Sequence, residues 1–507
     1  MSIDTPTATP SEAAPRLLRV DEQALARTSG APLLAGNAVR ILRDATDNFP
    51  AWLAAIRAAK QRILFENYLF AKDEVGREFV AALALKASEG VRVRLIYDWL
   101  GTPFPGRLFR PLVEAGGEVR RFNPPRLDNP LGWMSRDHRK SIVVDGQVGF
   151  VSGLCVSRRW MGDPAHGIEP WRDTGAELRG PAVAEIEQAF ARVWREMGAS
   201  IPDEELATVD AIPPAGDVEV TVVATEPAAA GMYRLDQFIA TIARRTLWLT
   251  DAYFVGMPAY VQALRAAAAD GVDVRLLVPG ASDLLVVSAF SRAGYRPLLE
   301  AGVRLFEWNG TMLHAKTAVA DCRWSRVGSS NLNASSFLAN YELDIAIYDE
   351  GIAREMEELY LSDLERATEI VLNQRRRVRP LGTGGGRGPE RGRMRASASR
   401  AAASAMRIGN TVGAALTNRR VLGPSEAGLM AKSGAALLVL AALAVIWPEA
   451  VAVPVGIVAG WVGVALMLKA WKLRQERRRD AGADLWRDEQ DVGVSPPDER
   501  GRAEIED

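Results

Sequence analysis

The feature that most constrains this chain is a short motif that occurs twice. Each copy has a histidine, a lysine two residues later and an aspartate five residues after the lysine. The copies are His138, Lys140 and Asp145 in DHRKSIVVD, and His314, Lys316 and Asp321 in MLHAKTAVAD. The chain has only 3 histidines, and two of them occupy this arrangement. One copy would recur by chance in a chain this long, but two copies indicate a duplicated unit.

The sequence around the motifs also repeats in a fixed order. PLVEAG at 111–116 returns as PLLEAG at 297–302, and GVRVRLIYD at 90–98 returns as GVDVRLLVP at 271–279. The separation between the copies differs from pair to pair, and differs again for the two histidines, while the order stays constant. This drift indicates duplicated domains with loop insertions, and not a short-period solenoid. Apolar strand patterns alternate with helical spacing in both halves, so each half is predicted to be α/β, with a sheet covered by helices.

Several local elements follow from the pattern of apolar and turn-forming residues. We expect a strand over 62–70, a helix over 78–87, a strand over 91–98 and a β-hairpin that turns at Asp145-Gly146. The segment IPPAGD at 212–217 reads as the linker between the halves.

The composition changes along the chain predict six regions. These are a disordered arm over 1–32, a first α/β domain over 33–209, a second over 210–373, an arginine-rich linker over 374–428, a hydrophobic helical hairpin over 429–471 and a polar tail over 472–507. The first twenty residues lack an apolar core and do not resemble a signal peptide.

The region after the second domain points to a membrane. Residues 375–420 hold 12 arginines and a single acid, Glu390, which is typical of a solvated linker or of a polybasic segment drawn to anionic lipid. Two apolar runs follow, over 433–447 and over 450–468, with cationic residues on both outer flanks. This pattern favours a transmembrane hairpin with both flanks in the cytoplasm, and hence catalytic domains on the cytoplasmic side of the cell membrane. A single span with an interfacial helix and a soluble helical pair are the alternatives. The two cysteines, Cys155 and Cys322, are far apart and fit a reducing compartment.

The repeated motif suits phosphodiester chemistry. Histidine titrates near neutral pH, so it serves as a nucleophile in one state and as a general acid in the other. The lysines supply positive charge where phosphoryl oxygens become more negative. After the second motif, the run Gly328 to Asn331 offers donors to the same oxygens, with Ser329 and Asn331 as predicted phosphate contacts. No cluster has metal-ligand spacing, so neither a metal nor another cofactor is expected.

From about residue 33 to 373 the chain resembles the phospholipase D superfamily, and within it the bacterial cardiolipin synthases. The resemblance is carried by the two motifs, by GSSN after the second, and by ENYLF, WRDTGAELRGPAV, TDAYF and NYELDIAIYD. It implies two homologous α/β/α sandwich domains, packed face to face with pseudo-twofold symmetry around one shared active site. It also implies a ping-pong reaction, in which one histidine attacks phosphorus while the other protonates the departing alcohol and then activates the acceptor.

The resemblance assigns roles residue by residue. Four residues match the phosphate-contacting positions, namely His138, Lys140, His314 and Lys316. Asp145 and Asp321 match the motif aspartates, which the family uses mainly to support the site. Asp173 and Glu342 are similar to the carboxylates that orient the histidines. We take His138 as the nucleophile and His314 as the acid and base, and we interpret the third histidine, His166, as a surface-loop residue.

The chain departs from the family pattern at one place. Where the family expects G-[SG]-x-N after the first motif, this sequence has Ser152-Gly153-Leu154-Cys155. A cysteine offers no amide donor, so the first half-site is predicted to hold phosphate more weakly than the second.

Three functions remain open. The favoured one is a cardiolipin synthase-like phosphatidyl transferase that joins two phosphatidylglycerols and releases glycerol. The alternatives are a hydrolytic phospholipase D or other phosphodiesterase, and a non-catalytic, membrane-anchored lipid-binding scaffold. The formal net charge is only -1, and the arginine-rich segment lies beside the apolar runs. We therefore expect anionic phospholipids and a membrane as partners, and no nucleic acid.

Overall fold

The computed structural model describes residues 22–125, 135–227, 229–283, 285–372 and 378–380, together with six isolated positions between 453 and 467. The elements discussed below belong to one structural unit, to which both halves of the chain contribute.

The first half alternates strands with helices, as its sequence pattern predicts. Its strands are β1 (Leu34–Arg43), β2 (Arg62–Asn67), β3 (Arg92–Asp98), β4 (Glu118–Phe122), β5 (Lys140–Val144), β6 (Val148–Ser152) and β7 (Thr174–Arg179). Its helices are α1 (Glu22–Ser29), α2 (Asp44–Ala58), α3 (Glu74–Ser88), α4 (Arg110–Glu114), α5 (Arg158–Met161) and α6 (Ala182–Glu196), with short 3-10 turns at Pro164–His166, Asp203–Glu205 and Val209–Ala211.

The second half repeats this order. Its strands are β8 (Val218–Thr225), β9 (Thr246–Thr250), β10 (Asp273–Pro279), β11 (Arg304–Trp308), β12 (Thr317–Ala320), β13 (Trp324–Gly328), β14 (Glu342–Tyr348), β15 (Ala367–Leu372) and β16 (Val378–Pro380). Its helices are α7 (Gly231–Ile242), α8 (Pro258–Ala269), α9 (Leu285–Glu300), α10 (Ala334–Leu338) and α11 (Glu350–Leu364).

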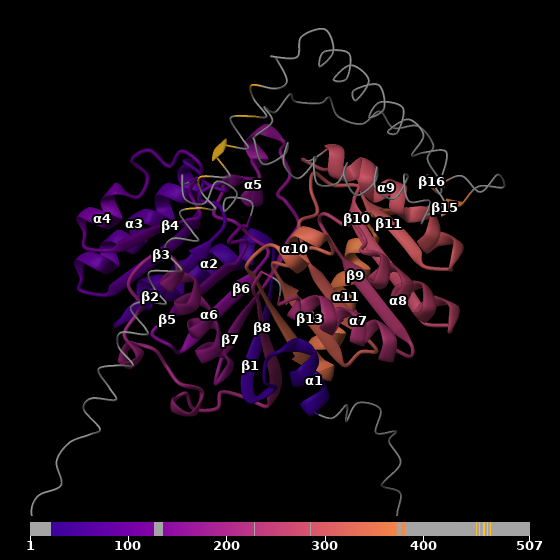
Figure 1. Ribbon diagram of the computed structural model, residues 1–507, viewed down its shortest axis with the longest axis horizontal. Helices are drawn as coiled ribbons and strands as arrows, with labels where there is room; N and C mark the ends of the chain where they lie inside the picture. Colours follow the sequence, from indigo (N-terminus) through magenta and orange to yellow (C-terminus); the bar gives the residue numbers. More distant parts are fainter. Residues whose placement is uncertain are drawn as a thin grey trace, which may run out of the picture. The chain divides into compact units, whose positions relative to one another are not determined.

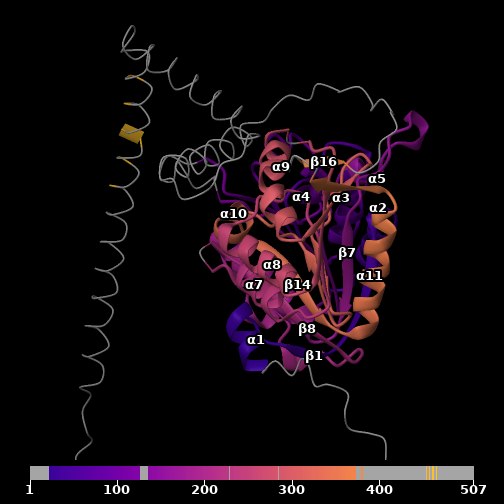
Figure 2. The ribbon, with the colours of Figure 1, turned by 90° about the vertical axis from the view of Figure 1, so that its right-hand side faces the viewer.

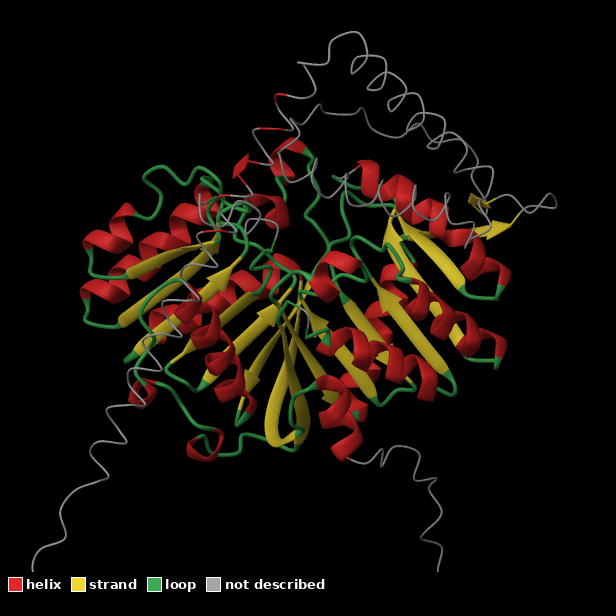
Figure 3. Cartoon of the chain, viewed as in Figure 1, coloured by secondary structure: helices red, strands yellow, loops and turns green. Residues whose placement is uncertain are grey.

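The two halves join through the edge strands β1 and β8, which pair antiparallel. Reading outward from this junction, the strand order is β1-β7-β6-β5-β2-β3-β4 on one side and β8-β14-β13-β12-β9-β10-β11 on the other, followed by β15 and β16 (Figures 1 and 3). Within each half, three strands run parallel and the rest are antiparallel, so the sheet is mixed. The identical order confirms the duplication inferred from the sequence.

Helices cover both faces of each half. In the first half α2, α3 and α4 pack on one face around an aromatic cluster that includes Phe49, Trp52, Phe65 and Phe79. In the second half, α7 and α8 lie on one side of the sheet and α11 lies on the other (Figure 2). The remaining core contains α6 of the first half and α11 of the second, and each of these helices also contacts the junction strand of the other half. The halves therefore share a hydrophobic core, which fixes the position of one half relative to the other.

Two predicted region boundaries are wrong. The arm over 1–32 was expected to be disordered, but residues 22–29 form α1, whose Leu25 is buried against the second half. The predicted linker over 374–428 begins with β16, which pairs with β15 and extends the second sheet. Both errors have the same cause, because each short segment is stabilised by contacts with the body of the protein that its own composition does not reveal.

The local predictions fare better. The hairpin at Asp145-Gly146 connects β5 to β6 as expected, while the predicted strand over 62–70 ends at Asn67 and the predicted helix over 78–87 begins earlier, at Glu74. Asp73 explains that earlier start, since its side chain caps the helix by accepting a hydrogen bond from the Gly76 amide.

Within the described ranges, no helix is long and apolar enough to cross a membrane. The predicted hairpin over 429–471 lies outside these ranges, apart from the isolated positions, as do the polar tail and nearly all of the arginine-rich linker.

Candidate active site

The two motif histidines lie where the halves meet, and each is bound by a carboxylate of the other half. The Nδ1 atom of His138, in the first half, is 2.8 Å from Oε2 of Glu342, at the start of β14 in the second half. The Nδ1 atom of His314, in the second half, is 2.8 Å from Oδ2 of Asp173, just before β7 in the first half. The predicted carboxylates are thus both at the site, but the pairing is exchanged between the halves.

Backbone hydrogen bonds hold this exchange in place. The amide of His138 donates to the carbonyl of Tyr341, the residue before Glu342, at 2.9 Å. The amide of His314 donates to the carbonyl of Arg172, the residue before Asp173, at 2.7 Å. Both contacts belong to isolated parallel β-bridges, one between Asp137 and Tyr341 and one between Arg172 and Leu313. Each imidazole is therefore positioned by main chain as well as by a carboxylate.

The rings have different surroundings. His138 has one aromatic neighbour with a described ring contact, Tyr68, whose centroid lies 5.1 Å away. His314 is surrounded by three aromatic rings, with the centroids of Trp160, Trp171 and Tyr253 at 5.1, 5.8 and 5.8 Å. The second ring is consequently the more enclosed of the two, with a side chain 6% exposed against 12% for His138.

The carboxylates are also supported differently. Glu342 accepts hydrogen bonds from the Ser329 hydroxyl at 2.6 Å and from the Asn340 amide at 3.1 Å. Asp173 accepts one from the Trp160 indole at 2.8 Å. At the position equivalent to Ser329 the first half has Gly153, where an added Cβ would lie only 2.1 Å from Asp173 Oδ1. The glycine thus makes room for the aspartate, and the tryptophan replaces the missing hydroxyl donor.

Electrostatics keep both rings neutral at neutral pH. Burial lowers the pKa of His138 to about 4, with help from Lys140 and against the opposing effect of Glu342. Burial and the charge of Lys316 lower the pKa of His314 to about 3, against the opposing effect of Asp173. Burial raises the pKa of Glu342 and of Asp173, but the contacts with their histidines, the lysine charges and the hydrogen bonds from Ser329 and Trp160 together lower it, to about 2 for Asp173. The carboxylates therefore remain ionised. A neutral ring with Nδ1–H directed at a carboxylate carries its lone pair on Nε2. In His314 this Nε2 lies 3.1 Å from Nζ of Lys316.

The two lysines act on both half-sites. Lys140 donates a hydrogen bond to the carbonyl of His138, and Lys316 donates one to the carbonyl of His314. The Nζ atom of Lys316 also lies 2.8 Å from Nδ1 of its own histidine. In addition, the charge of Lys316 lowers the pKa of His138, and that of Lys140 lowers the pKa of His314. Because each lysine acts on the histidine of the other half, the four residues form one electrostatic site.

The two motif aspartates lie elsewhere. Asp145 and Asp321 follow β5 and β12, at the opposite ends of these strands from the histidines, and the strands themselves are about 17 and 13 Å long. Both have a positive φ, of 55° and 54°. Their carboxylates accept backbone N–H groups at the starts of β2 and β9, from Lys60, Gln61 and Arg62 in one half and from Arg244, Arg245 and Thr246 in the other. They therefore fix strand ends, and the structure does not bring them to the histidines.

The predicted phosphate contacts lie next to the site. The hydroxyl of Ser329 donates a hydrogen bond to Glu342 and accepts one from the Leu343 amide, so it positions the carboxylate that contacts His138. Asn331 is buried, and its side-chain oxygen has no partner among the described residues. Cys155 occupies the equivalent position of the first half as a buried free thiol, whose raised pKa reflects burial opposed by the charges of Lys140 and Lys316.

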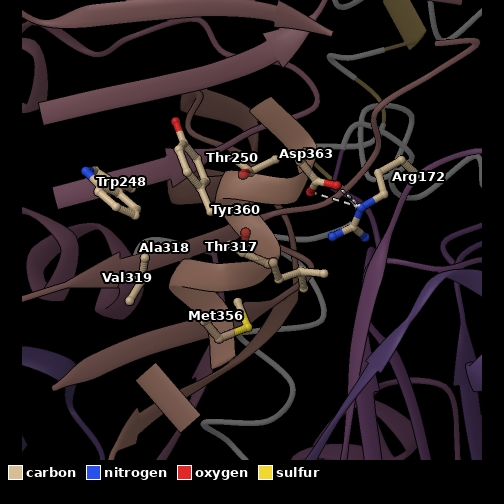
Figure 4. Close-up of a pocket in the computed structure, with 10 residues that line it drawn as sticks. Arg172, Trp248, Thr250, Thr317, Ala318, Val319, Met356, Tyr360 and Asp363 are labelled. Carbon is tan, nitrogen blue, oxygen red and sulfur yellow. Dashed lines mark hydrogen bonds and ion pairs between the residues drawn. The ribbon is translucent and has the colours of Figure 1, made fainter. Parts of the chain in front are cut away.

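Two buried arginines that the sequence interpretation did not single out connect the halves beside the histidines. Arg139 donates to the carbonyls of Glu342, Ala189 and Thr225, and so connects the first motif to β14 and β8. Arg172 forms a buried ion pair with Asp363 of α11 at 2.9 Å (Figure 4).

A small cavity of about 10 Å³ lies beside this ion pair, between Trp248, Tyr360 and the start of β12 (Figure 4). It has room for about one water molecule. Breaking a buried pair such as Arg172–Asp363 leaves an uncompensated charge, at a cost of about 3–5 kcal/mol.

The sequence gives little indication that Arg139, Arg172 and Trp160 support the site. Arg139 and Arg172 each adjoin a site residue, and Trp160 lies in the insertion between His138 and Asp173, but the contacts of all three depend on the other half or on a distant loop. His166 is on the surface of that insertion, as expected, with its ring 74% exposed. In the described part of the chain, no three or more His, Cys, Asp or Glu side chains are grouped so as to hold a metal ion.

Comparison with known proteins shows which family the chain resembles. The family profile described as "Cardiolipin synthase, PLD-like domain" matches residues 52–194 and 238–364, one segment in each half. Cardiolipin synthase A of Pseudomonas aeruginosa is 36% identical over 366 residues, covering 71% of this chain and 73% of that protein. A cardiolipin synthase of Halalkalibacterium halodurans is 32% identical over 356 residues, covering 69% and 70%.

One solved structure supports the fold alone. Phosphatidylserine synthase of Haemophilus influenzae superimposes with a TM-score of 0.54 over 68% of this chain and 91% of that one, at 14% sequence identity.

Proposed function

The chain belongs to the phospholipase D-like family of cardiolipin synthases, and on that premise we propose that it is a phosphatidyl transferase that joins two phosphatidylglycerols and releases glycerol. The observation that carries the proposal is the exchanged pairing of His138 with Glu342 and of His314 with Asp173. This pairing holds two imidazoles in one electrostatic site, so that one can attack phosphorus while the other transfers protons, as a two-step transfer requires.

In the first step, Nε2 of His138 attacks the phosphorus of one phosphatidylglycerol. Glu342 receives the Nδ1–H hydrogen bond and stabilises the positive charge that develops on the ring. The bond from phosphorus to the glycerol headgroup breaks, and His314 in its protonated form transfers a proton to the departing oxygen. The negative phosphodiester favours that protonated form, since it offsets the lysine charge that lowers the pKa of His314. The products are a phosphatidyl group bound to His138 and free glycerol.

In the second step, the now neutral His314 accepts a proton from a headgroup hydroxyl of a second phosphatidylglycerol. That oxygen attacks phosphorus, the bond to His138 breaks, and the diphosphatidyl product leaves. Both rings return to their starting state. Lys140 and Lys316 supply positive charge to the phosphoryl oxygens in both steps.

The C-terminal region has a supporting role in this proposal. We place residues 429–471 in the cell membrane and the catalytic halves on its cytoplasmic side, on the strength of the two apolar runs and the cations that flank them. This arrangement keeps the site close to lipid substrates.

The test of the proposal is to incubate the purified full-length protein with phosphatidylglycerol vesicles and to analyse the products by mass spectrometry. We expect a diphosphatidyl lipid and free glycerol in equal amounts, and no product from His138→Ala or His314→Ala. Phosphatidic acid as the sole lipid product would instead establish a hydrolase. No product from the wild-type protein would favour the scaffold.

A further inference from the structure

Four large apolar side chains are exposed on loops and at the ends of short helices, along one edge of the protein. They are Phe104 at 78%, Ile168 at 54%, Leu338 at 47% and Met161 at 38% exposure, and we call this set the apolar rim. Isolated exposed apolar residues are ordinary on protein surfaces. These four differ because each projects from a segment that contacts an aromatic residue beside one of the two motif histidines.

Strand directions place the rim on the active-site edge. Phe104 follows the carboxyl end of β3, and Met161 and Ile168 lie between the end of β6 and the start of β7. The strand partners show that the end of β2, the start of β5, the end of β6 and the start of β7 share one edge, and His138 precedes β5 there. Leu338 lies at the equivalent edge of the second half, between β13 and β14. This edge is the upper one in Figure 3, where loops join the central strands.

The Phe104 loop is attached directly to the His138 side of the site. Gly101 is pressed against Tyr68, since an added Cβ would lie 1.9 Å from the Tyr68 carbonyl oxygen, and the Tyr68 ring contacts His138. The Thr102 hydroxyl accepts the amide of Phe70 at 2.9 Å. The base of the loop is therefore fixed, while its tip, Pro103-Phe104-Pro105, projects outward with restricted backbone freedom.

The other rim residues are attached to the His314 side. Ile168 closes a short turn with Asp163 through two backbone hydrogen bonds of 2.7 and 2.9 Å, and Met161 adjoins Trp160. Trp160 and Trp171, at the base of this insertion, pack on each other and on His314. Leu338 ends α10, whose capping residue Asn333 donates to the carbonyl of Tyr253, the third ring beside His314.

Cations accompany the most exposed tip. Lys72 and Arg107 are both exposed, and an added Cβ at Gly106 would lie 3.5 Å from the Lys72 ammonium. Neither side chain forms an ion pair with a carboxylate of the described residues. A rigid aromatic tip beside unpaired cations matches the interface of an anionic bilayer, where the apolar group enters the acyl boundary and the charges meet headgroups.

We propose that the apolar rim is the surface by which the catalytic halves rest on a phospholipid bilayer containing anionic lipid, so that headgroups enter directly between His138 and His314. This inference rests on the proposed function, because that function brings both substrates from a bilayer.

The first experiment separates bilayer contact from chemistry. The full-length Phe104→Ser/Ile168→Ser variant is compared with wild type on phosphatidylglycerol vesicles and on dihexanoyl phosphatidylglycerol kept monomeric in solution. We expect at least a tenfold lower rate on vesicles and less than a threefold change on the monomeric substrate. The matched control is Leu85→Ser, since Leu85 is 57% exposed but lies in the last turn of α3, at the opposite edge. It should behave as wild type on both substrates. An unchanged vesicle rate, or an equal loss on both substrates, would overturn the proposal.

The second experiment does not depend on catalysis, so it still decides the question if the wild-type protein transfers nothing. A fluorophore is attached to Phe104→Cys or to Leu85→Cys in a Cys322→Ser background, and vesicles with nitroxide-labelled acyl chains are added. Quenching at position 104 but not at position 85 is the expected result. Equal quenching or none contradicts it. If sedimentation without lipid shows that Phe104→Ser/Ile168→Ser dissociates an oligomer, while position 104 is not quenched, the rim is a contact between protein copies and the proposal fails.

Discussion

The two half-sites have the same histidine–carboxylate contact but support it by different means. In one, Glu342 is held by a serine hydroxyl and an asparagine amide, and His138 contacts the single ring of Tyr68. In the other, Asp173 is held by a tryptophan, and His314 is enclosed by aromatic rings. The Nδ1–carboxylate distance is 2.8 Å in both.

The two halves thus have the same histidine–carboxylate contact, although the residues that surround it differ. The Nδ1–carboxylate distance is the same in a polar and in an aromatic environment. The reason is that the backbone β-bridges fix the position of each histidine relative to the carboxylate of the other half. In the proposed reaction, the more enclosed His314 transfers protons away from bulk water, and the more exposed His138 carries the bulky phosphatidyl group.

The largest expected effect comes from removing the charge of either carboxylate. Asp173→Asn and Glu342→Gln each leave the shape nearly unchanged but remove the charge that fixes the Nδ1–H tautomer. We expect each to lower kcat by roughly 10²–10⁴-fold, by analogy with the loss of the orienting carboxylate in catalytic triads. Steady-state rates on phosphatidylglycerol vesicles measure this. If one variant kept the wild-type rate, the half-sites would not act on a common phosphorus.

A smaller and unequal effect is expected where the supports differ. Gly153→Ala places a methyl group against Asp173, whereas Ser329→Gly introduces no clash and removes one hydroxyl, with its hydrogen bonds to Glu342 and from the Leu343 amide. Gly153→Ala should therefore lower both kcat and Tm, while Ser329→Gly should lower kcat by roughly 10–100-fold, the worth of a hydrogen bond to a charged group. Thermal unfolding and kinetics on the same preparations provide the measurement. Equal Tm losses in the two variants would contradict the packing difference.

The sequence singled out the two histidines and two lysines because their spacing repeats, and it predicted an α/β fold because strand and helix patterns alternate twice. It did not reveal that Asp173 serves His314 and Glu342 serves His138, since that pairing exists only once the halves have met. Asp145 and Asp321 illustrate the opposite case. They belong to the motif, but the positive φ of each and its three amide donors assign it to a turn. The roles of Arg139, Arg172 and Trp160 come from contacts across the junction or from an insertion. No local sequence pattern predicts these contacts.

The lysines provide a pH-dependent test. Burial and the charge of Lys140 lower the pKa of Lys316 to about 8, against the opposing effect of Asp173. The protonated form carries the useful charge, so that charge is present below pH 8 and lost as the pH rises through it. We expect kcat to fall by about tenfold per pH unit above this value. In Lys316→Arg, which stays charged, the alkaline decline should move to higher pH. If kcat declined at the same pH in the variant, the decline would come from the titration of a group other than Lys316.

The smallest effect is expected at the one departure from the family pattern. Cys155→Asn adds an amide donor near Lys140 and Lys316 without a large change in volume. One neutral hydrogen bond contributes about 0.5–1 kcal/mol, so kcat/KM should rise by roughly two- to fivefold. Kinetics at low substrate concentration measure this change. A loss of activity would show that the thiol itself is needed, and that the first half-site is not simply a weaker phosphate cradle.

The most direct measurement of the central claim, that both histidines act on a single phosphorus, is a trapping experiment with His314→Ala and His138→Ala. The substrate is a phosphatidyl ester of p-nitrophenol, whose leaving group needs no proton. In His314→Ala, we predict that one phosphatidyl group per chain accumulates on His138, as located by mass spectrometry of the digested protein, and that none accumulates in His138→Ala. Labelling of both histidines in the wild-type protein, or of His314 in the His138→Ala variant, would contradict the account.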